Sequence, residues 1–364
     1  MITIFSIFIL SIQILFWFST YLLKRDISEI KYNLPLKPIP FSVIISARNE
    51  AQNLIKYLPS ILEQDYPTVE IIVIDDDSSD DSLDILNHFK QKYPVLRIIE
   101  IKNKKYPGKK YGLQEAINHA SYEWLVFTDA DCYPQSNQWL QGIAAKCNSS
   151  TDIVLGYSPY QLNNSYLNNF IRYEAFITAV LYGTFTLAGM PYMGVGRNMA
   201  YRKSKFMEKV DKEKFEKISF GDDDMAVNAM ADSRNTAIQF DTRARVISLP
   251  KSTFQDFIHQ KTRHISASAY YHWIHQLFLG VLGLSQAFFY PLCFLMLFLN
   301  FKLGIMLFIF RITSFLINIL PLMSRMEVKD LRKKVILMDF LFFLYYWYIS
   351  IKRIGTKNIS WTKK

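Results

Sequence analysis

The sequence is poor in cysteine, and this excludes a disulfide-stabilised protein and a protein with a cysteine metal site. Cys132, Cys147 and Cys293 are too few for a disulfide framework, and their spacing is not that of a metal site. Three scattered thiols fit a reducing, cytoplasmic setting. The chain of 364 residues also lacks low-complexity segments, and hydrophobic residues make up 50% of it. This composition excludes a disordered protein and allows one large soluble domain together with membrane segments.

Charge is absent from residues 2–23, which are apolar enough and long enough to cross a bilayer. Lys24 and Arg25 follow at once. A cleaved signal peptide would need a basic start, a shorter apolar core and a small-residue cleavage site, none of which is visible. We therefore expect residues 1–23 to form an uncleaved transmembrane anchor with its N-terminus outside.

The other end of the chain contains three more apolar stretches, at 277–299, 303–322 and 335–351. Only three residues separate the first two, which predicts a tight membrane hairpin. Residues 324–334 and 352–364, which flank the third stretch, are both basic and both favour the cytoplasm. Three full spans cannot satisfy both. Either the third stretch lies in or re-enters the membrane interface, or the tail is an exception to the positive-inside rule.

The formal net charge of +10 raises the question whether the protein binds nucleic acid. The surplus of lysine and arginine is concentrated beside the apolar stretches, so anionic lipid is the expected partner and nucleic acid is not. Within 303–322 the only charged residue is Arg311. Because most of the chain is soluble in pattern and no intramembrane acid network is visible, a transporter is not expected.

Residues 40–250 have the pattern of an α/β domain. Short apolar runs at 41–46, 70–75, 96–101 and 123–129 predict strands, and the segments 50–64, 80–92 and 109–120 between them predict helices. Such alternation indicates a mostly parallel sheet covered by helices. Ligands of these sheets bind at the carboxyl ends of the strands, so polar residues that follow the strands are candidates for a site.

Acidic residues follow two of these strands. Asp75 and Asp76 exceed what capping of the next helix requires, because Ser79 or Asp80 can cap it, and they are placed to hold the base or ribose of a ligand. Two further carboxylates, Asp129 and Asp131, end the strand at 123–129, where Mg²⁺ or Mn²⁺ bound together with substrate phosphates would relieve their repulsion. An acid-rich turn without metal is the alternative. The neighbouring Cys132 reads as a packing residue.

A third acidic cluster, Asp222, Asp223 and Asp224, begins a short predicted helix. Acids favour a helix N-terminus, but three adjacent acids exceed that need, and crowded carboxylates have raised pKa values suited to a general base. The glycine turn 194–198 allows close approach to a ligand but lacks the Lys-Ser/Thr of a phosphate loop. Lys109 either binds a diphosphate or belongs to a solvated lysine run.

Residues 251–275 contain an amphipathic stretch that reads as an interfacial helix leading into the membrane region 276–351. Gln260 and Arg263 can in addition face the site, where arginine would pair with phosphate. The histidines nearby, His264 among them, show no metal-ligand spacing.

Taken in order, the motifs SARNE, DDDSSD, PGKK, TDADC, GDDD and QKTRH, followed by apolar segments, resemble the membrane-bound members of glycosyltransferase family 2 over about residues 40–270. The resemblance implies a GT-A type fold, a nucleotide-binding α/β sheet. GDDDMAVN is similar to the GDDRHLTN of hyaluronan and chitin-oligosaccharide synthases, and QKTRH is similar to a family Q-x-x-R-W motif with His264 in place of tryptophan. The implied site residues are Asp223 with Asp222 as catalytic acids; Ala47, Asn49, Glu50, Asp75, Asp76, Lys109 and Asp129 for the donor; Asp131 for the metal; and Gln260, Arg263, His264, Gly196 and Arg197 for the acceptor or diphosphate.

The function implied is that of an inverting, Mg²⁺- or Mn²⁺-dependent glycosyltransferase of the cell membrane. It would move a sugar from a nucleotide-diphosphate donor to a lipid-linked or lipid-like acceptor at the cytoplasmic face, in cell-envelope biosynthesis. Three alternatives remain: a processive polysaccharide synthase, which the missing tryptophan disfavours, a nucleotidyltransferase releasing pyrophosphate, and a noncatalytic membrane scaffold with a degenerate nucleotide-binding fold.

Overall fold

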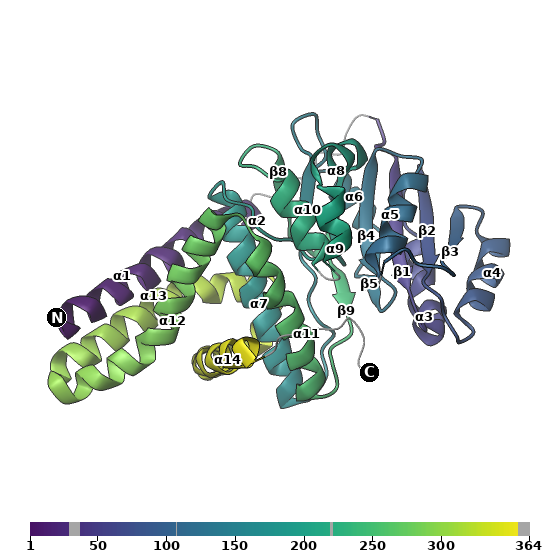
Figure 1. Cartoon of the computed structure of the whole chain (residues 1–364). Coiled ribbons are helices and arrows are strands. Elements are labelled where there is room, and N and C mark those ends of the chain that lie inside the picture. The colour runs from purple at the N-terminus through teal and green to yellow at the C-terminus, as the bar shows by residue number, and fades with distance from the viewer. Residues whose placement is uncertain (29–36, 107, 219–220, 356–364) are drawn as a thin grey trace. The chain divides into compact units, whose positions relative to one another are not determined.

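The computed structural model describes residues 1–28, 37–106, 108–218 and 221–355 (Figure 1). Within them the chain forms two compact units. Residues 37–161 and 185–250 make a sheet unit, and residues 1–28, 162–184 and 251–355 make a helical unit.

The sheet unit is built on a seven-stranded sheet with the order β3-β2-β1-β4-β7-β6-β8. β1, β2, β3 and β4 are mutually parallel, β6 and β8 are parallel to each other, and β7 runs antiparallel to both of its neighbours. Its strands are β1 Phe41–Ala47, β2 Val69–Asp75, β3 Leu96–Glu100, β4 Trp124–Asp129, β6 Ile153–Gly156, β7 Met199–Arg202 and β8 Thr236–Gln239. A small antiparallel pair joins β5 Cys132–Pro134 to β9 Val246–Ser248.

Helices connect and cover these strands. The four predicted strands and three predicted helices of residues 41–129 are confirmed, with ends that differ by one or two residues. The helices are α3 Ala51–Leu62, α4 Ser82–Lys92, α5 Lys110–His119, α6 Trp139–Ala144, α8 Lys203–Lys209, α9 Lys212–Lys217 and α10 Asp222–Met230, with a 3₁₀ turn, η1, at Thr242–Ala244.

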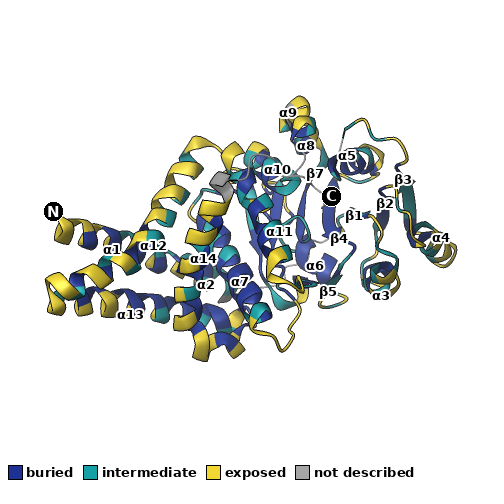
Figure 2. Ribbon diagram, turned by 60° about the horizontal axis from the view of Figure 1, so that its bottom comes forward, coloured by how far each residue is buried: buried dark blue, intermediate teal, exposed yellow. Residues whose placement is uncertain are grey.

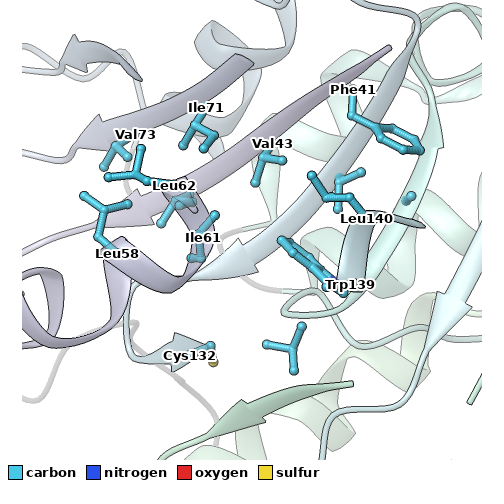
Figure 3. Packing of buried hydrophobic residues seen from close by; sticks show 14 of the residues in the cluster. Phe41, Val43, Leu58, Ile61, Leu62, Ile71, Val73, Cys132, Trp139 and Leu140 are labelled. Carbon is cyan, nitrogen blue, oxygen red and sulfur yellow. The ribbon is translucent and has the colours of Figure 1, made fainter. Parts of the chain in front are cut away.

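The core of the sheet unit explains why the strands are continuous apolar runs. Val43, Ile71 and Val73 are fully buried, and Figure 3 shows Leu58 and Ile61 of α3 packed over them. Each such side chain contributes about 1.5–3 kcal/mol by leaving water. Because both faces of the sheet are covered, the strands need apolar residues at successive positions.

Strand register positions the candidate site. Ala47 of β1 pairs with Asp75 of β2, and Ser46 pairs with Asp129 of β4. The carboxyl ends of these three parallel strands therefore lie at one edge of the sheet, where ligands of such sheets bind.

The helical unit contains the apolar ends of the chain. Four of its segments are long and apolar enough to cross a membrane: Ile2–Ile27, Trp273–Leu299, Phe301–Arg325 and Lys329–Lys352. Their outer surfaces expose many large hydrophobic side chains (Figure 2). The elements are α1 Ile2–Ser19, α2 Tyr21–Ser28, α7 Tyr166–Leu187, α11 Phe254–Ala267, η2 Ser268–Tyr270, α12 Trp273–Leu299, α13 Phe301–Arg325, η3 Lys329–Lys334 and α14 Val335–Gly355.

The predicted hairpin of two apolar helices is confirmed, and its turn is tighter than expected. α12 ends at Leu299 and α13 begins at Phe301, so Asn300 alone makes the turn. The Asn300 side chain accepts a hydrogen bond from the Leu303 N–H at 3.1 Å and so caps α13.

Candidate active site

Lys109 joins the carboxylates of two elements at the sheet edge. It is the N-cap residue of α5, and its Nζ lies 3.3 Å from Asp222 Oδ2 and 3.5 Å from Asp129 Oδ1. Burial alone would lower the pKa of Lys109, but Asp129 and Asp222 raise it above its ordinary value. Lys109 is therefore charged at neutral pH and holds the end of β4 against the start of α10. The solvated-lysine interpretation of Lys109 is wrong.

Asp223 is held beside this ion pair by backbone donors. Its carboxylate accepts hydrogen bonds from the Gly196 N–H and the Asp224 N–H, both at 2.9 Å. Gly221, with φ of 66°, turns the chain into α10 in a conformation that glycine adopts without strain. A Cβ on Gly196 would lie 3.2 Å from Asp223 Oδ2, so the close approach also favours glycine there.

The surroundings of Asp223 favour the protonated form of its carboxyl group. Burial raises the pKa of Asp223, and the neighbouring Asp222 raises it further, whereas Lys109 lowers it. A carboxylate with a raised pKa accepts a proton more readily near neutral pH than an ordinary one. The sequence-based expectation of a crowded acid at this position agrees with this geometry.

These groups line one pocket together with mostly apolar side chains. Lys109, Asp129, Asp222 and Asp223 provide charge, and Gly196 provides a backbone edge. The remaining lining residues are Ile44, Ser46, Leu113, Ile117, Phe127, Thr128, Met199, Tyr201 and Phe215. A mostly apolar lining with a few charged groups is typical of a small-molecule site.

Asp129 and Asp131 also form the candidate metal site. One ligand atom from each of Asp129, Asp131 and Cys132 lies within 4.8 Å of the others. The Cys132 thiol is buried and donates to Asp131 Oδ1 at 3.3 Å, and burial raises its pKa well above its ordinary value. Cys132 therefore stays a thiol, as a packing residue would, and two carboxylate oxygens remain as donors. Oxygen donors fit Mg²⁺ or Mn²⁺.

Asp75 and Asp76 lie buried at the end of β2. Asp76 forms an ion pair with Lys104 at 2.7 Å, and among the described residues Oδ1 of each aspartate lacks a hydrogen-bond partner. Buried carboxylate oxygens without a partner are costly, and a ligand that donates hydrogen bonds would remove the cost. The role predicted for them, holding a nucleotide, stays a prediction.

The other predicted donor residues shape the loop after β1. Ala47 O accepts the Asp76 N–H at 2.8 Å, and Glu50 N–H donates to Ser82 Oγ at 2.9 Å. Asn49 has a positive φ of 56°, and its Oδ1 accepts the Ser79 N–H at 2.8 Å. Their polar contacts therefore tie this loop to the loop after β2.

Arg197 and Asn198 are fixed by the sheet unit. Arg197 donates to Ser158 Oγ at 2.8 Å and stacks over the Tyr160 ring, with 4.7 Å to its centroid. Asn198 is 1% exposed, and its Oδ1 accepts a hydrogen bond from Trp139 Nε1 at 3.0 Å. Asn198 thus anchors the turn that carries Gly196.

The remaining predicted residues lie on another element. Gln260, Arg263 and His264 belong to α11 of the helical unit. Their part in the site therefore stays a prediction.

Sequence reasoning missed two lysines. Lys104 pairs with Asp76, and Lys110, which is 0% exposed, donates to the Phe215 carbonyl at 3.3 Å and lies over the Phe215 ring. Both belong to the lysine-rich stretch 102–110, whose composition signals solvent exposure. Only the position of Lys110 at a predicted helix start could have drawn attention to it, and Lys104 has no such signal.

Comparison with known proteins gives a consistent result. Residues 42–209 match the family model of Glycosyl transferase family 2. A segment is 36% identical over 118 residues to the poly(ribitol-phosphate) beta-glucosyltransferase of Bacillus spizizenii, covering 32% of this chain and 18% of that protein. Another match, 37% over 92 residues, covers 25% of this chain and 35% of the Escherichia coli UDP-Glc:alpha-D-GlcNAc-diphosphoundecaprenol beta-1,3-glucosyltransferase WfaP. The chain thus matches well under half the length of these relatives.

Among solved structures, the mannosyltransferase PcManGT of Pyrobaculum calidifontis, solved in complex with GDP-Man and Mn²⁺, is similar with a TM-score of 0.60. The match covers 98% of this chain and 100% of that one at 16% identity, which shows a shared fold. The GT-A-like sheet with its mostly parallel strands agrees with the predicted fold class. Residues 42–209 of this chain are a glycosyl transferase family 2 domain.

Proposed function

We propose that the protein is an inverting glycosyltransferase that moves a sugar from a nucleotide-diphosphate donor to a lipid-linked or lipid-like acceptor at the cytoplasmic face of the membrane, in cell-envelope biosynthesis. The observation that carries the proposal is the cluster in which Lys109 joins Asp129 to Asp222, next to Asp223, which accepts a hydrogen bond from the Gly196 backbone. The cluster supplies a candidate base and a candidate phosphate-side group at one pocket.

Asp223 acts as the general base in this proposal. The acceptor hydroxyl gives its proton to the Asp223 carboxylate while its oxygen attacks the anomeric carbon, and the bond from that carbon to the diphosphate oxygen breaks. The two backbone donors fix the carboxylate, and the raised pKa suits it to receive a proton. A single displacement inverts the anomeric centre.

The donor side is held by the groups at the strand ends. Asp75 and Asp76 accept hydrogen bonds from the nucleoside, and the charged Lys109 faces the negative diphosphate. A divalent ion held by Asp131 would supply a Lewis acid that stabilises charge on the leaving diphosphate. The presence of Mn²⁺ and GDP-Man with PcManGT supports a metal-assisted donor site of this kind.

The acceptor class rests on the helical unit and on the relatives. Four helices of this chain are apolar enough to span a membrane, and WfaP is named for a diphosphoundecaprenol-linked acceptor. Membrane anchoring confines a lipid acceptor and the enzyme to one surface, which raises their encounter rate.

The test is a product assay on the purified chain in lipid vesicles, with a panel of nucleotide sugars, Mg²⁺ or Mn²⁺, and a membrane lipid extract. We expect release of nucleoside diphosphate together with a labelled lipid. Asp223→Asn should lower kcat about 10²–10⁴-fold, and Asp131→Asn should lower turnover and weaken its dependence on metal.

Asp84→Asn is the matched control, because Asp84 is an exposed acid on α4. It should leave turnover unchanged. Pyrophosphate as the released product would instead identify a nucleotidyltransferase, and full activity in Asp223→Asn would contradict the assignment of the base.

A further inference from the structure

Lys110 is a buried charge that the proposed reaction does not use. Its side chain is 0% exposed, and it is the first residue of α5, directly after Lys109. The ammonium donates to the Phe215 carbonyl oxygen at 3.3 Å and to the Met225 thioether at 3.1 Å, and it lies 4.3 Å from the centroid of the Phe215 ring. Phe215 belongs to α9 and Met225 to α10, so one side chain of α5 contacts both of these helices.

An ammonium is a costly group at this position. It carries three donors, and among the described residues one carbonyl oxygen and one thioether sulfur, which is a weak acceptor, receive them. A buried charge lowers stability unless it is well paired, and a methionine of similar length would pack here without that penalty. The charge of Lys110 therefore points to a role beyond packing.

Both helices that Lys110 contacts form part of the candidate active site. The Phe215 carbonyl is in the last turn of α9, where carbonyls have no partner within the helix, and the Phe215 side lines the same pocket as Asp222 and Asp223. Met225 follows Asp222 by three residues on α10, so these two side chains are neighbours on the helix surface. A shift of either helix would move the pocket wall or the proposed base.

We propose that Lys110 is a positioning residue, whose charged side chain holds the end of α9 and the start of α10 together and so keeps Asp222 and Asp223 at the pocket. The proposal rests on the proposed function. Because Lys110 is fully buried, it acts through these helices and not by contact with substrate. Its contacts with the carbonyl and the ring weaken when the ammonium loses its proton, because both depend on the charge.

The groups around Lys110 set the pH at which this charge is lost. Burial lowers the pKa of Lys110 to about 8, against the opposing effect of Asp222 and Asp223, and the neighbouring Lys109 lowers it further. The other charged or titratable groups that the structure describes on the three helices are Tyr111, Glu115, His119, Lys212, Glu213, Glu216, Lys217 and Asp224. Lys110 is therefore mostly charged at neutral pH and loses its proton as the pH rises through about 8.

The pH dependence of turnover in the product assay tests this role. We expect kcat of the wild type to fall as the pH rises above about 8. Lys110→Met has no charge to lose, so the fall near this pH should be absent. At pH 7 its kcat should be about 10–100-fold lower than that of the wild type, because the acids are misplaced. KM should change little, since Lys110 does not touch the substrate.

Lys203→Met is the matched control. Lys203 also donates to backbone carbonyls, those of Asn118 at 3.0 Å and Ala120 at 2.8 Å, but these lie at the opposite end of α5. This variant should keep the pH profile of the wild type. A fall near pH 8 that persists in Lys110→Met, or wild-type turnover in that variant, would overturn the proposal.

Hydrogen–deuterium exchange gives a second readout that needs no substrate. At pH 7 the backbone amides of α10 should exchange roughly tenfold faster in Lys110→Met than in the wild type, and those of α4 should not change. Faster exchange in the variant, with no sugar transfer by the wild type, would support the positioning of α10 and count against the proposed function alone. Sugar transfer by the wild type, with unchanged exchange in the variant, would refute the positioning role.

Discussion

Replacing Lys109 by methionine should move the acid limb of the pH–rate profile to higher pH. The positive charge of Lys109 lowers the pKa of Asp223, and Lys109 also pairs with Asp222 and Asp129. Asp223 must be ionised to accept the acceptor proton. When the lysine charge is lost, the pKa of Asp223 rises, so a smaller fraction is ionised at any given acidic pH.

The geometry sets the size of the effect. At 3.3 Å, the Lys109–Asp222 pair would have a Coulomb energy of about 5 kcal/mol at an effective dielectric constant of 20, much of it offset by desolvation. Opposite charges within about 4–6 Å commonly lower a carboxyl pKa by about 1–3 units. We therefore expect the limb to move to higher pH, with a roughly tenfold loss of rate below it for each pH unit that the limb moves.

The assay is kcat/KM against pH for Lys109→Met and for Lys104→Met. Lys104 pairs with Asp76 and not with the acid cluster, so its loss should alter donor affinity and leave the limb in place. A uniform rate loss in Lys109→Met, with no movement of the limb, would refute the assignment of Asp223 as the base and leave Lys109 as a donor contact.

Two further changes test packing. Arg311→Met or Asp339→Leu alone leaves one buried charge without its partner and should lower the free energy of unfolding by about 3–5 kcal/mol. The double variant should recover most of that stability, which thermal unfolding in detergent would measure. Equal melting temperatures in the wild type and all three variants would contradict this. Gly156→Ala would place a Cβ 2.6 Å from the Asn198 carbonyl oxygen and should displace the turn at 194–198. We expect the free energy of unfolding to fall by about 1–3 kcal/mol and turnover to decrease. Unchanged turnover would show that the turn tolerates the shift.

The first half of the sheet could be predicted because its strands are continuous buried runs. β1, β2 and β4 each end in a polar residue or lead into one, and parallel strands end at one edge, so Asp75 and Asp129 could be assigned to the same edge of the sheet. β6, β7 and β8 have four residues each, too few for a clear period. These strands pair with segments far away in the sequence, and so does the turn whose Gly196 donates to Asp223. Such contacts could not be predicted from local patterns.

The lysine contacts could not be read from the sequence for another reason. Lys109 and Lys110 are adjacent and chemically identical, yet Lys109 forms ion pairs with two carboxylates, whereas Lys110 donates to the Phe215 carbonyl. Burial lowers the pKa of Lys110 to about 8. Only the direction of each side chain at the start of α5 decides this.

The connection between β6 and β7 has a consequence for the order in which the sheet unit can fold. The chain leaves the sheet unit after Gln161, forms most of α7 in the helical unit, and returns at Phe185. β7 alone joins β4 to β6, so the sheet stays in two pieces until the segment beyond α7 has been synthesised. Folding of the sheet therefore has to wait until α7 of the helical unit has been synthesised. A variant without the apolar ends of the chain would still carry α7 between β6 and β7.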